Sequence, residues 1–486
     1  MKCVHVCALA LAACAVGVQA QQSDADPLHI GSVIVSGSIM ERYEFWDFFQ
    51  GAGQSNYGFS GSLLQLAFSQ KAQGYDWTLD FAAPVLLGLP NQAVKPSPLG
   101  QYGLGASYFA ANQGNTDVAG FFLKQGYFRI KGENSSLQLG RFEFADGMEG
   151  KPKDATLTAL RASQIQQHLI GTFGFSDVRR SFDGAHYDRT TDGWNFTAVA
   201  SIPTRGVFQT DGWGWVKTPF VYMAATHDLN YGQSNAEWRL FAVYYNDDRP
   251  LVKTDNRPAA AKAHDLGGIN IATFGGHYIQ DVPTAAGTFD LLGWGAIQTG
   301  TWGTQTQKAG AANGELGFQP KGFGRLGPLL KPWFRGGMFW SSGDGNPNDG
   351  THGTFFTMLP TPRVYARYPF YNEMNNSDLF AEMTLRPWKK VTFRSDFHDV
   401  WLSNSHDLWY GGGGAFQPWT FGYLGRPSNG FSKLADVYDT SADFQLNRQV
   451  ALGLYFAYAQ GGAVVRHIFP PGPDSKFGFI EMDYAF

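Results

Sequence analysis

The sequence is poor in cysteine, and this scarcity excludes several kinds of site. The chain has three cysteines, Cys3, Cys7 and Cys14, all close to its start. If that segment is removed as a leader, the rest of the chain can form no disulfide and no thiolate metal site. It also offers no thiol nucleophile.

Charged residues and long apolar runs are scarce as well. Charged residues make up 16% of the chain, against about 25% in soluble domains. Lysine and arginine number 37 against 41 acidic residues, a formal net charge of −4. There is no basic run or zinc-finger spacing, so no nucleic-acid partner is expected. Beyond the leader, no apolar run approaches the ~20 residues of a membrane-spanning helix.

Signatures of catalysis are missing too. The chain contains no H-E-x-x-H and no G-x-S-x-G motif. Four His-Asp dipeptides occur, but adjacent residues of a strand point to opposite faces, so each is a poor catalytic dyad. Neither an enzyme nor a cofactor is therefore expected. The dipeptides are His227-Asp228, His264-Asp265, His398-Asp399 and His406-Asp407.

Glycine and aromatic residues, in contrast, are abundant. The chain has 60 glycines, and phenylalanine, tryptophan and tyrosine together make up 15% of it. A chain of this kind without a helical span can cross a membrane only as a closed β-barrel. The composition thus favours an all-β membrane protein.

The end of the chain carries the clearest strand pattern. Ile480, Met482, Tyr484 and Phe486 alternate with polar or small residues, which is the period of a strand with one apolar face. In an outer-membrane barrel the apolar face meets lipid and the polar face meets the lumen. We interpret these four residues as the C-terminal signal that closes such a barrel. The edge strand of a soluble sheet is the alternative.

The start of the chain reads as a secretion signal. Met1-Lys2 is basic, residues 4–18 are apolar, and Val18-Gln19-Ala20 is a small-residue cleavage pattern. A second interpretation is lipidation of Cys14 in a lipoprotein-type box. The expected division is a signal peptide at 1–20, a short segment at 21–29 and the barrel at 30–486, placed in the bacterial outer membrane.

Alternating segments predict about eighteen antiparallel strands in a single transmembrane barrel. Connections alternate between short turns, expected on the periplasmic side, and long extracellular loops such as 85–117, 145–176 and 343–376, which are candidates to fold inward and gate the lumen. The predicted strands are 30–45, 59–70, 75–84, 118–131, 135–144, 177–189, 193–202, 215–227, 234–246, 265–280, 287–300, 306–318, 331–342, 377–387, 389–402, 434–446, 449–461 and 475–486.

Several segments resemble the alginate export family of outer-membrane porins. They are residues 137–147 (LQLGRFEFADG), 180–184 (RSFDG), 342–350 (SGDGNPNDG) and 393–401 (FRSDFHDVW), and the strands of 436–462. The resemblance implies an 18-stranded channel for passive export or diffusion of a polysaccharide, with an alginate-like anion as one cargo. The near balance of basic and acidic residues departs from the arginine-rich lumen of that family. A general or substrate-specific porin for small polar solutes is therefore the alternative.

Polar residues on the predicted inward face are candidates to line the pore. A basic ladder would ease the passage of carboxylated sugars, whereas lumenal ion pairs would stiffen the wall. Arg141 comes from the resemblance, and by strict alternation it shares a face with Leu137 and Leu139. The candidates are Arg42, Glu44, Asp76, Asp80, Arg141, Arg239, Trp333, Arg335, Glu382, Arg386, Arg394, Asp396 and His398.

Two further features have competing interpretations. Trp77, Trp238, Tyr244 and Trp401 suit an interfacial aromatic girdle better than a sugar-stacking path, whereas Trp333 lies opposite Phe334, Met338 and Trp340. Asp344, Asn346 and Asn348 have the alternate spacing of a calcium loop, but the glycine comes one residue late and Phe355 takes the place of the final glutamate. A turn-rich loop explains them better.

The expected location in the outer membrane predicts which partners the chain contacts. Membrane lipid and lipopolysaccharide would surround the barrel, and a polysaccharide or other polar solute would pass through it. Export would also require periplasmic partners to deliver polymer. A monomer is expected.

Overall fold

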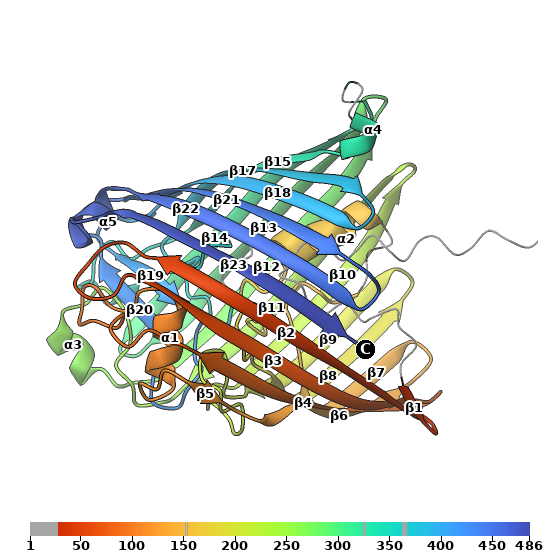
Figure 1. Cartoon of the computed structure of the whole chain (residues 1–486), viewed down its shortest axis with the longest axis horizontal. Helices are drawn as coiled ribbons and strands as arrows, with labels where there is room; N and C mark the ends of the chain where they lie inside the picture. Colours follow the sequence, from red (N-terminus) through yellow and green to blue (C-terminus); the bar gives the residue numbers. More distant parts are fainter. Residues whose placement is uncertain (1–27, 151, 153, 323, 325–326, 362–366) are drawn as a thin grey trace, which may run out of the picture.

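The chain forms one closed antiparallel barrel of 18 strands (Figure 1). The computed structural model describes residues 28–486 except 151, 153, 323, 325–326 and 362–366. The expected signal peptide, 1–20, lies outside the described residues. Within the described ranges, no helix has the length and apolar character needed to span a bilayer.

The strands of the wall run up and down in sequence order. Their bounds are β2 (Val33–Asp47), β3 (Asn56–Lys71), β4 (Tyr75–Leu87), β6 (Phe122–Lys131), β7 (Ser135–Phe142), β8 (Phe182–Thr191), β9 (Trp194–Pro203), β10 (Phe220–Tyr231), β11 (Ser234–Asp247), β12 (Ile269–Pro283), β13 (Gly287–Trp302), β14 (Gln305–Pro320), β15 (Trp333–Ser341), β17 (Ser377–Trp388), β18 (Val391–Trp401), β21 (Lys433–Gln445), β22 (Val450–Gly461) and β23 (Asp474–Ala485).

The other elements are short and lie in the connections or before the first wall strand. The strands are β1 (Leu28–Ile30), β5 (Val118–Ala119), β16 (Thr351–His352) and the separate hairpin β19 (Leu408–Gly412) and β20 (Tyr423–Pro427). The helices are α1 (Leu104–Ala111), α2 (Ala155–Leu160) with the π-helix η1 (Arg161–Ile165), α3 (Ala259–His264), α4 (Gly327–Leu330) and α5 (Ala463–Ile468).

The last strand closes the barrel. β23 pairs antiparallel with both β22 and β2. Beyond its last ladder residue, Phe486 exchanges two backbone hydrogen bonds of 3.0 Å with Gly37. Ile480 and Met482 are about half exposed on the outer face. The predicted terminal strand thus completes the wall, as the alternating pattern indicated.

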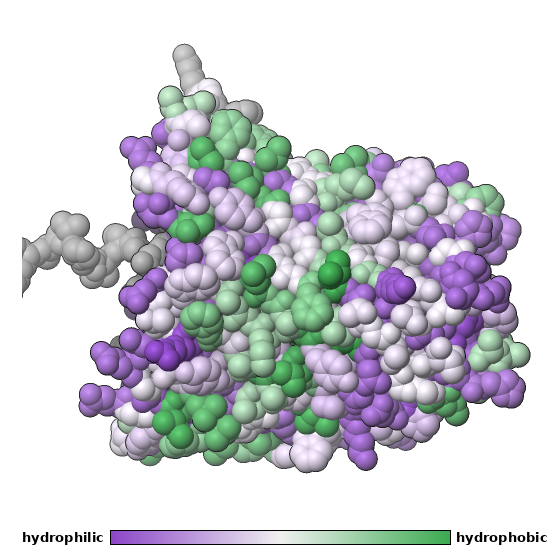
Figure 2. Space-filling model, turned by 180° about the vertical axis from the view of Figure 1, so that it is seen from behind, coloured by the Kyte–Doolittle hydropathy of each residue, from purple (hydrophilic) through white to green (hydrophobic). Residues whose placement is uncertain are grey.

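The wall has an apolar outside and a polar inside because side chains alternate along each strand. Leu240, Ile297 and Leu316 are 60%, 66% and 71% exposed on the outer face. Their inward neighbours, such as Arg239, Gln298 and Glu315, are buried. Figure 2 shows apolar residues gathered across the middle of the wall, with hydrophilic residues at both ends. This is the profile of a barrel that crosses a bilayer.

All eighteen predicted strands are present, with ends displaced by a few residues. The largest differences are at the start of β8 and β10, predicted at 177 and 215 but found at Phe182 and Phe220. The first strand also begins later than predicted, because β1 folds back on β2 through Gly31, whose φ of 61° suits a tight turn. Turns and long loops alternate as expected, with two exceptions. Residues 303–304 join β13 and β14 at the long-loop end, and residues 321–332 join β14 and β15 at the turn end.

Candidate functional site

The lumen is the candidate functional site, and two long loops occupy it. The β7–β8 loop, residues 143–181, meets the β15–β17 loop, residues 342–376, as two parallel extended segments. The Gly171 N–H donates to the Leu359 carbonyl at 2.7 Å, and the Leu359 N–H donates to the Leu169 carbonyl at 2.8 Å. Both loops join one apolar core with inward residues of the wall, including Trp294 and Phe380. The two loops therefore pack as a unit inside the barrel.

The β7–β8 loop reaches deep toward the turn end of the barrel. Asp154 caps α2 by accepting from the Thr156 and Leu157 N–H groups. The Thr156 hydroxyl in turn accepts from Gln319, close to the end of β14. Since β14 runs from the long-loop end to the turn end, this loop extends along most of the lumen. It narrows any path through the barrel.

Arg42 lies at the seam where the barrel closes. Its guanidinium contacts the Glu481 carboxylate and lies 3.5 Å from Glu44 and 3.3 Å from Asp177 of the β7–β8 loop. It also stacks on the Phe175 ring, 4.0 Å from the centroid. This predicted lumenal arginine is buried and neutralised by carboxylates on three sides.

Arg239 belongs to a second ion-pair network. Its Nη1 atom donates to Glu149 of the β7–β8 loop at 2.9 Å. Arg161 of η1 bonds Glu237 at 3.1 Å, and the ring of His277 bonds the same Glu237 at 2.8 Å. The network fastens the β7–β8 loop to strands β11 and β12.

A third cluster lies around Trp333. Arg335 donates to Glu315 at 2.9 Å and contacts Asp290, which also accepts the Trp333 indole N–H at 2.8 Å. Arg386 stacks over the Trp333 ring at 5.7 Å. Within the described part of the chain, Arg386 has no carboxylate partner. Among the described residues it is thus the candidate arginine without an ion pair.

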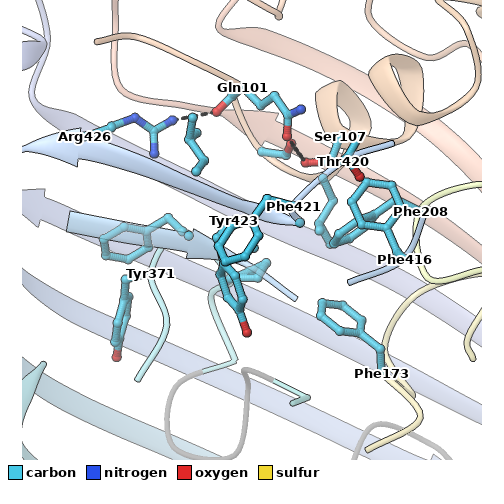
Figure 3. A pocket seen from close by; sticks show the side chains of 18 of the residues that line it. Gln101, Ser107, Phe173, Phe208, Tyr371, Phe416, Thr420, Phe421, Tyr423 and Arg426 are labelled. Atoms are coloured by element: carbon cyan, nitrogen blue, oxygen red, sulfur yellow. Dashed lines mark hydrogen bonds between the residues drawn. The ribbon is translucent and has the colours of Figure 1, made fainter. Parts of the chain in front are cut away.

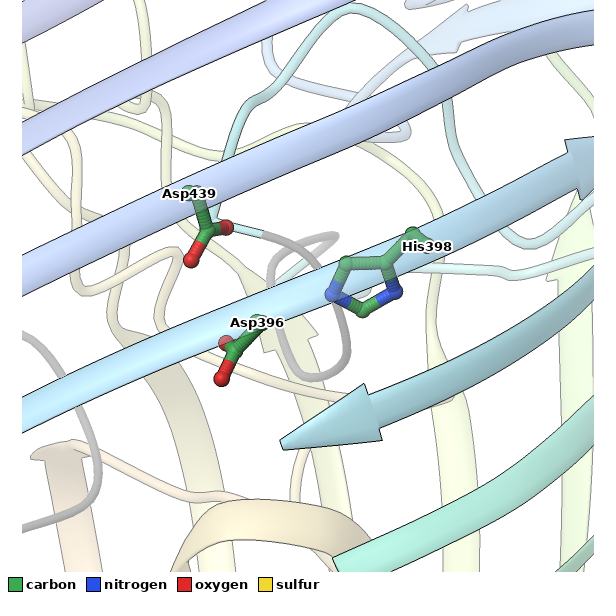
Figure 4. Close-up of side chains that lie close together, drawn as sticks. All are labelled: Asp396, His398 and Asp439. Atoms are coloured by element: carbon green, nitrogen blue, oxygen red, sulfur yellow. The ribbon is translucent and has the colours of Figure 1, made fainter. Parts of the chain in front are cut away.

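The remaining inward candidates are carboxylates and their partners. Asp76 lies 3.6 Å from both Arg129 and Lys131. Asp80 accepts from Gln65 at 3.1 Å. Arg394 contacts Glu382 and Asp396, and His398 bonds Asp378 on the same stretch of the wall, shown in part in Figure 4. The structure therefore places twelve of the thirteen candidates on the lumenal face.

Arg141 is the exception. It occupies the same face of β7 as the exposed Leu139, whereas Gln138 and Phe142 are buried on the other side. Its guanidinium makes two hydrogen bonds of 2.7 Å with Asp183 and one of 2.9 Å with the Leu123 carbonyl. The expectation that Arg141 lines the lumen is thus corrected: strict alternation holds, and no bulge turns the side chain inward.

Sequence reasoning missed the groups that hold the loops together. His168 bonds Glu373 of the other loop at 2.7 Å, and Arg180 donates to the Gly413 and Pro360 carbonyls. Burial lowers the pKa of Arg180 to about 10. Burial also raises the pKa of Asp146 to about 6 despite the nearby Arg239. Arg180 opens the RSFDG segment and Asp146 lies in the 137–147 segment, so these two had a signal in the sequence. His168 and Glu373 lie in loops that show no periodic pattern.

A pocket of about 230 Å³ lies between loops at the long-loop end (Figure 3). Phe173, Phe208, Phe416 and Tyr423 supply aromatic walls, and Gln101 and Ser107 add polar groups. Arg426 closes one side, with its guanidinium 4.4 Å from the Trp409 ring centroid. Burial lowers the pKa of Arg426 to about 9. Aromatic faces beside a cation can hold a ring that carries hydroxyl or carboxylate groups.

The remaining sequence features fall outside the lumen. Trp238, Tyr244 and Trp401 lie on the outer face, as the girdle interpretation expects, and Trp77 shares the face of exposed Leu79. In the loop at 344–348, Asp344 accepts from the Asn346 N–H and Asn346 accepts from the Asn348 N–H, each at 3.1 Å. These contacts favour a series of turns.

Comparison with known proteins places the chain in a family. The sequence model described as alginate export matches residues 106–470. The chain belongs to the alginate export family. The resemblance seen in residues 137–147 and later segments is thereby confirmed, and this family member is an outer-membrane barrel whose family and fold point to a channel rather than an enzyme.

Solved structures share the fold of this family member at very low sequence identity. OpdK of Pseudomonas aeruginosa has a TM-score of 0.55 and 9% identity, over 93% of this chain and 98% of that one. OccAB2 of Acinetobacter baumannii has a TM-score of 0.55 and 8% identity, over 93% of this chain and 98% of that one. OccK8 (OprE) of P. aeruginosa has a TM-score of 0.53 and 10% identity, over 93% of this chain and 98% of that one. No curated relative matches the chain in sequence.

Proposed function

We propose that this barrel is a passive channel for polar solutes of the carbohydrate class, with uronate-type anions as the first candidates. Membership of the alginate export family supports the solute class. The lumen supports passive selection by width and polar lining. Diffusion needs no covalent chemistry, and the direction of flow follows the gradient of the solute.

The paired loops in the lumen favour short solutes over long polymer. The β7–β8 and β15–β17 loops are hydrogen-bonded to each other, and their apolar residues are packed against the wall. Loops packed in this way leave less room for a solute, which favours short oligomers. A polysaccharide can cross only when the loops separate, so the second candidate function is uptake of small polar solutes through the packed state.

The charge of the lumen also favours short solutes over long polymer. Arg42, Arg239, Arg335 and Arg394 each contact at least one carboxylate. Because these arginines are neutralised, they do not form the continuous basic ladder that a highly charged anionic polymer would need. Local cations such as Arg386 and Arg426 can still bind single carboxylate groups.

Single-channel recording in a planar bilayer tests this proposal. The refolded protein is measured with uronate oligomers of increasing length, and with neutral sugars of the same lengths as controls. We expect open channels that short uronates block at lower concentration than neutral sugars do. Channels that respond equally to both would remove the preference for uronates, and the absence of conductance would overturn the channel itself.

A further inference from the structure

Three acidic side chains lie in a row across the lumenal wall. Asp396 of β18 is directly opposite Asp439 of β21 on one side and Glu382 of β17 on the other. Asp396 and Asp439 are each only 4% exposed. Like charges opposite each other in a sheet are destabilising. Arg394 contacts Glu382 and Asp396, two of these three carboxylates.

His398 completes this cluster from the same strand. It is two residues from Asp396, so both side chains point into the lumen. The His398 Nδ1 atom lies 2.8 Å from the Asp378 carboxylate. Its Nε2 atom is buried and has no hydrogen-bond partner, and the side chain is 1% exposed. A buried ring nitrogen without a partner costs free energy unless a ligand occupies it.

Three side chains that can bind a metal converge in this cluster. Ligand atoms of Asp396, His398 and Asp439 lie within 4.8 Å of one another (Figure 4). Arg394 contacts the Asp396 Oδ2 atom, whereas Asp396 Oδ1 is buried without a hydrogen-bond partner. We propose that Asp396, His398 and Asp439 bind one divalent transition-metal ion of the zinc type in the wall of the barrel.

The donor set indicates the class of metal. Calcium and magnesium prefer ligand sets made only of oxygen, whereas an imidazole nitrogen with carboxylates suits zinc and similar ions. The Asp378 carboxylate bonds Nδ1 of His398, and a carboxylate in this position commonly orients a metal-binding histidine. The Tyr455 hydroxyl donates to Asp439 at 3.0 Å and orients the second carboxylate. These partners hold the three ligands in place.

A bound ion would offset the carboxylate row and tie β18 to β21. Glu382 and Arg394, which neighbour the three ligands, line a small cavity of about 20 Å³. Two negative charges of the lumen would then be compensated, which makes the local field more favourable to anions.

Calorimetric titration with ZnCl₂ tests the site. The full chain is refolded in detergent, stripped with EDTA and titrated as wild type, His398→Gln, Asp439→Asn and His186→Gln. We expect one zinc ion per chain, affinity weakened at least tenfold in His398→Gln and Asp439→Asn, and no change in His186→Gln. His186 lies 2.7 Å from Asp188 and is a matched histidine-carboxylate pair elsewhere in the lumen. Absence of saturable binding, or unchanged affinity in His398→Gln, overturns the proposal.

A second measurement keeps the test valid if a variant does not fold. X-ray absorption at the zinc edge of the loaded wild type should show imidazole scattering together with oxygen neighbours at about 2.0–2.2 Å. A spectrum without an imidazole contribution overturns the assignment. Asp378→Asn should retain the ion with an affinity reduced by about 10–100-fold, because that residue positions the ring without touching the metal.

Discussion

Arg42 of β2 contacts the Glu481 carboxylate of β23 across 439 positions of sequence, so an ion pair joins the first and last strands of the barrel. The two side chains are each 2% exposed. The same guanidinium donates to the Phe175 carbonyl of the β7–β8 loop. One arginine therefore links closure of the wall to insertion of a loop.

Replacing Arg42 should destabilise the closed barrel. Arg42→Met leaves Glu481, Glu44 and Asp177 buried without their common cation, and breaking a buried pair costs about 3–5 kcal/mol. Urea unfolding in lipid vesicles measures this loss. Lys476→Met is the matched control, because Lys476 pairs with Asp47 between the same two strands but both are exposed; we expect less than about 1 kcal/mol there. Equal losses in the two variants would contradict the role of Arg42.

The contact between the two lumenal loops should depend on pH through His168. Burial lowers the pKa of His168, but the charge and hydrogen bond of Glu373 outweigh burial and raise it above the ordinary value. The docked loops are then most stable below the unfolded pKa of about 6.5 and lose this contribution as pH rises through the raised value.

Limited proteolysis of the two loops at several pH values measures this effect. Cleavage in the wild type should become faster above the raised pKa of His168. In His168→Gln the pH dependence should flatten, because the titrating group is gone. A variant with the same pH profile as the wild type would assign the effect to other groups, such as Asp146.

Locking the two loops should stop long solutes and spare short ones. Ile170 and Leu359 face each other in the parallel bridge, so cysteines at both positions are placed to form a disulfide. The oxidised double variant should conduct small ions while excluding uronate polymer, and reduction should restore the wild-type behaviour. Each single cysteine variant is the control. Polymer passage through the oxidised protein would show that the loops need not separate.

Arg386 should affect ion selectivity, and Arg141 should not. Among the residues that the structure describes, no carboxylate pairs with Arg386, whereas Asp183 neutralises Arg141 on the outer face. Arg386→Ala should lower the anion-to-cation permeability ratio by about twofold, since a lumenal charge acts directly on passing ions. Arg141→Ala should leave the ratio unchanged. Reversal potentials in a salt gradient measure both, and a shift in Arg141→Ala alone would reverse the assignment.

The wall of the barrel was predictable because its pattern is local. Lipid outside and polar groups inside impose a period of two, so Ile480 and Met482 could be assigned to the outer face without the fold. The same rule assigned Arg42, Asp76 and Arg394 inward. It also placed Arg141 beside Leu139, and the structure follows that rule rather than the expectation drawn from the family. The start of β8 was displaced because Arg180, just before it, bonds backbone carbonyls of other loops.

The sequence by itself determined the eighteen strands, their order, the alternation of turns and loops and the face of nearly every wall residue, because each depends on neighbours in the chain. Tertiary structure alone decided which charges pair, since partners such as Arg42 and Glu481 are far apart in sequence. It also decided that the β7–β8 and β15–β17 loops pack into the lumen, because their apolar residues lack a period and become core only when the closed wall surrounds them. The convergence of Asp396, His398 and Asp439 likewise required β18 and β21 to pair in one register.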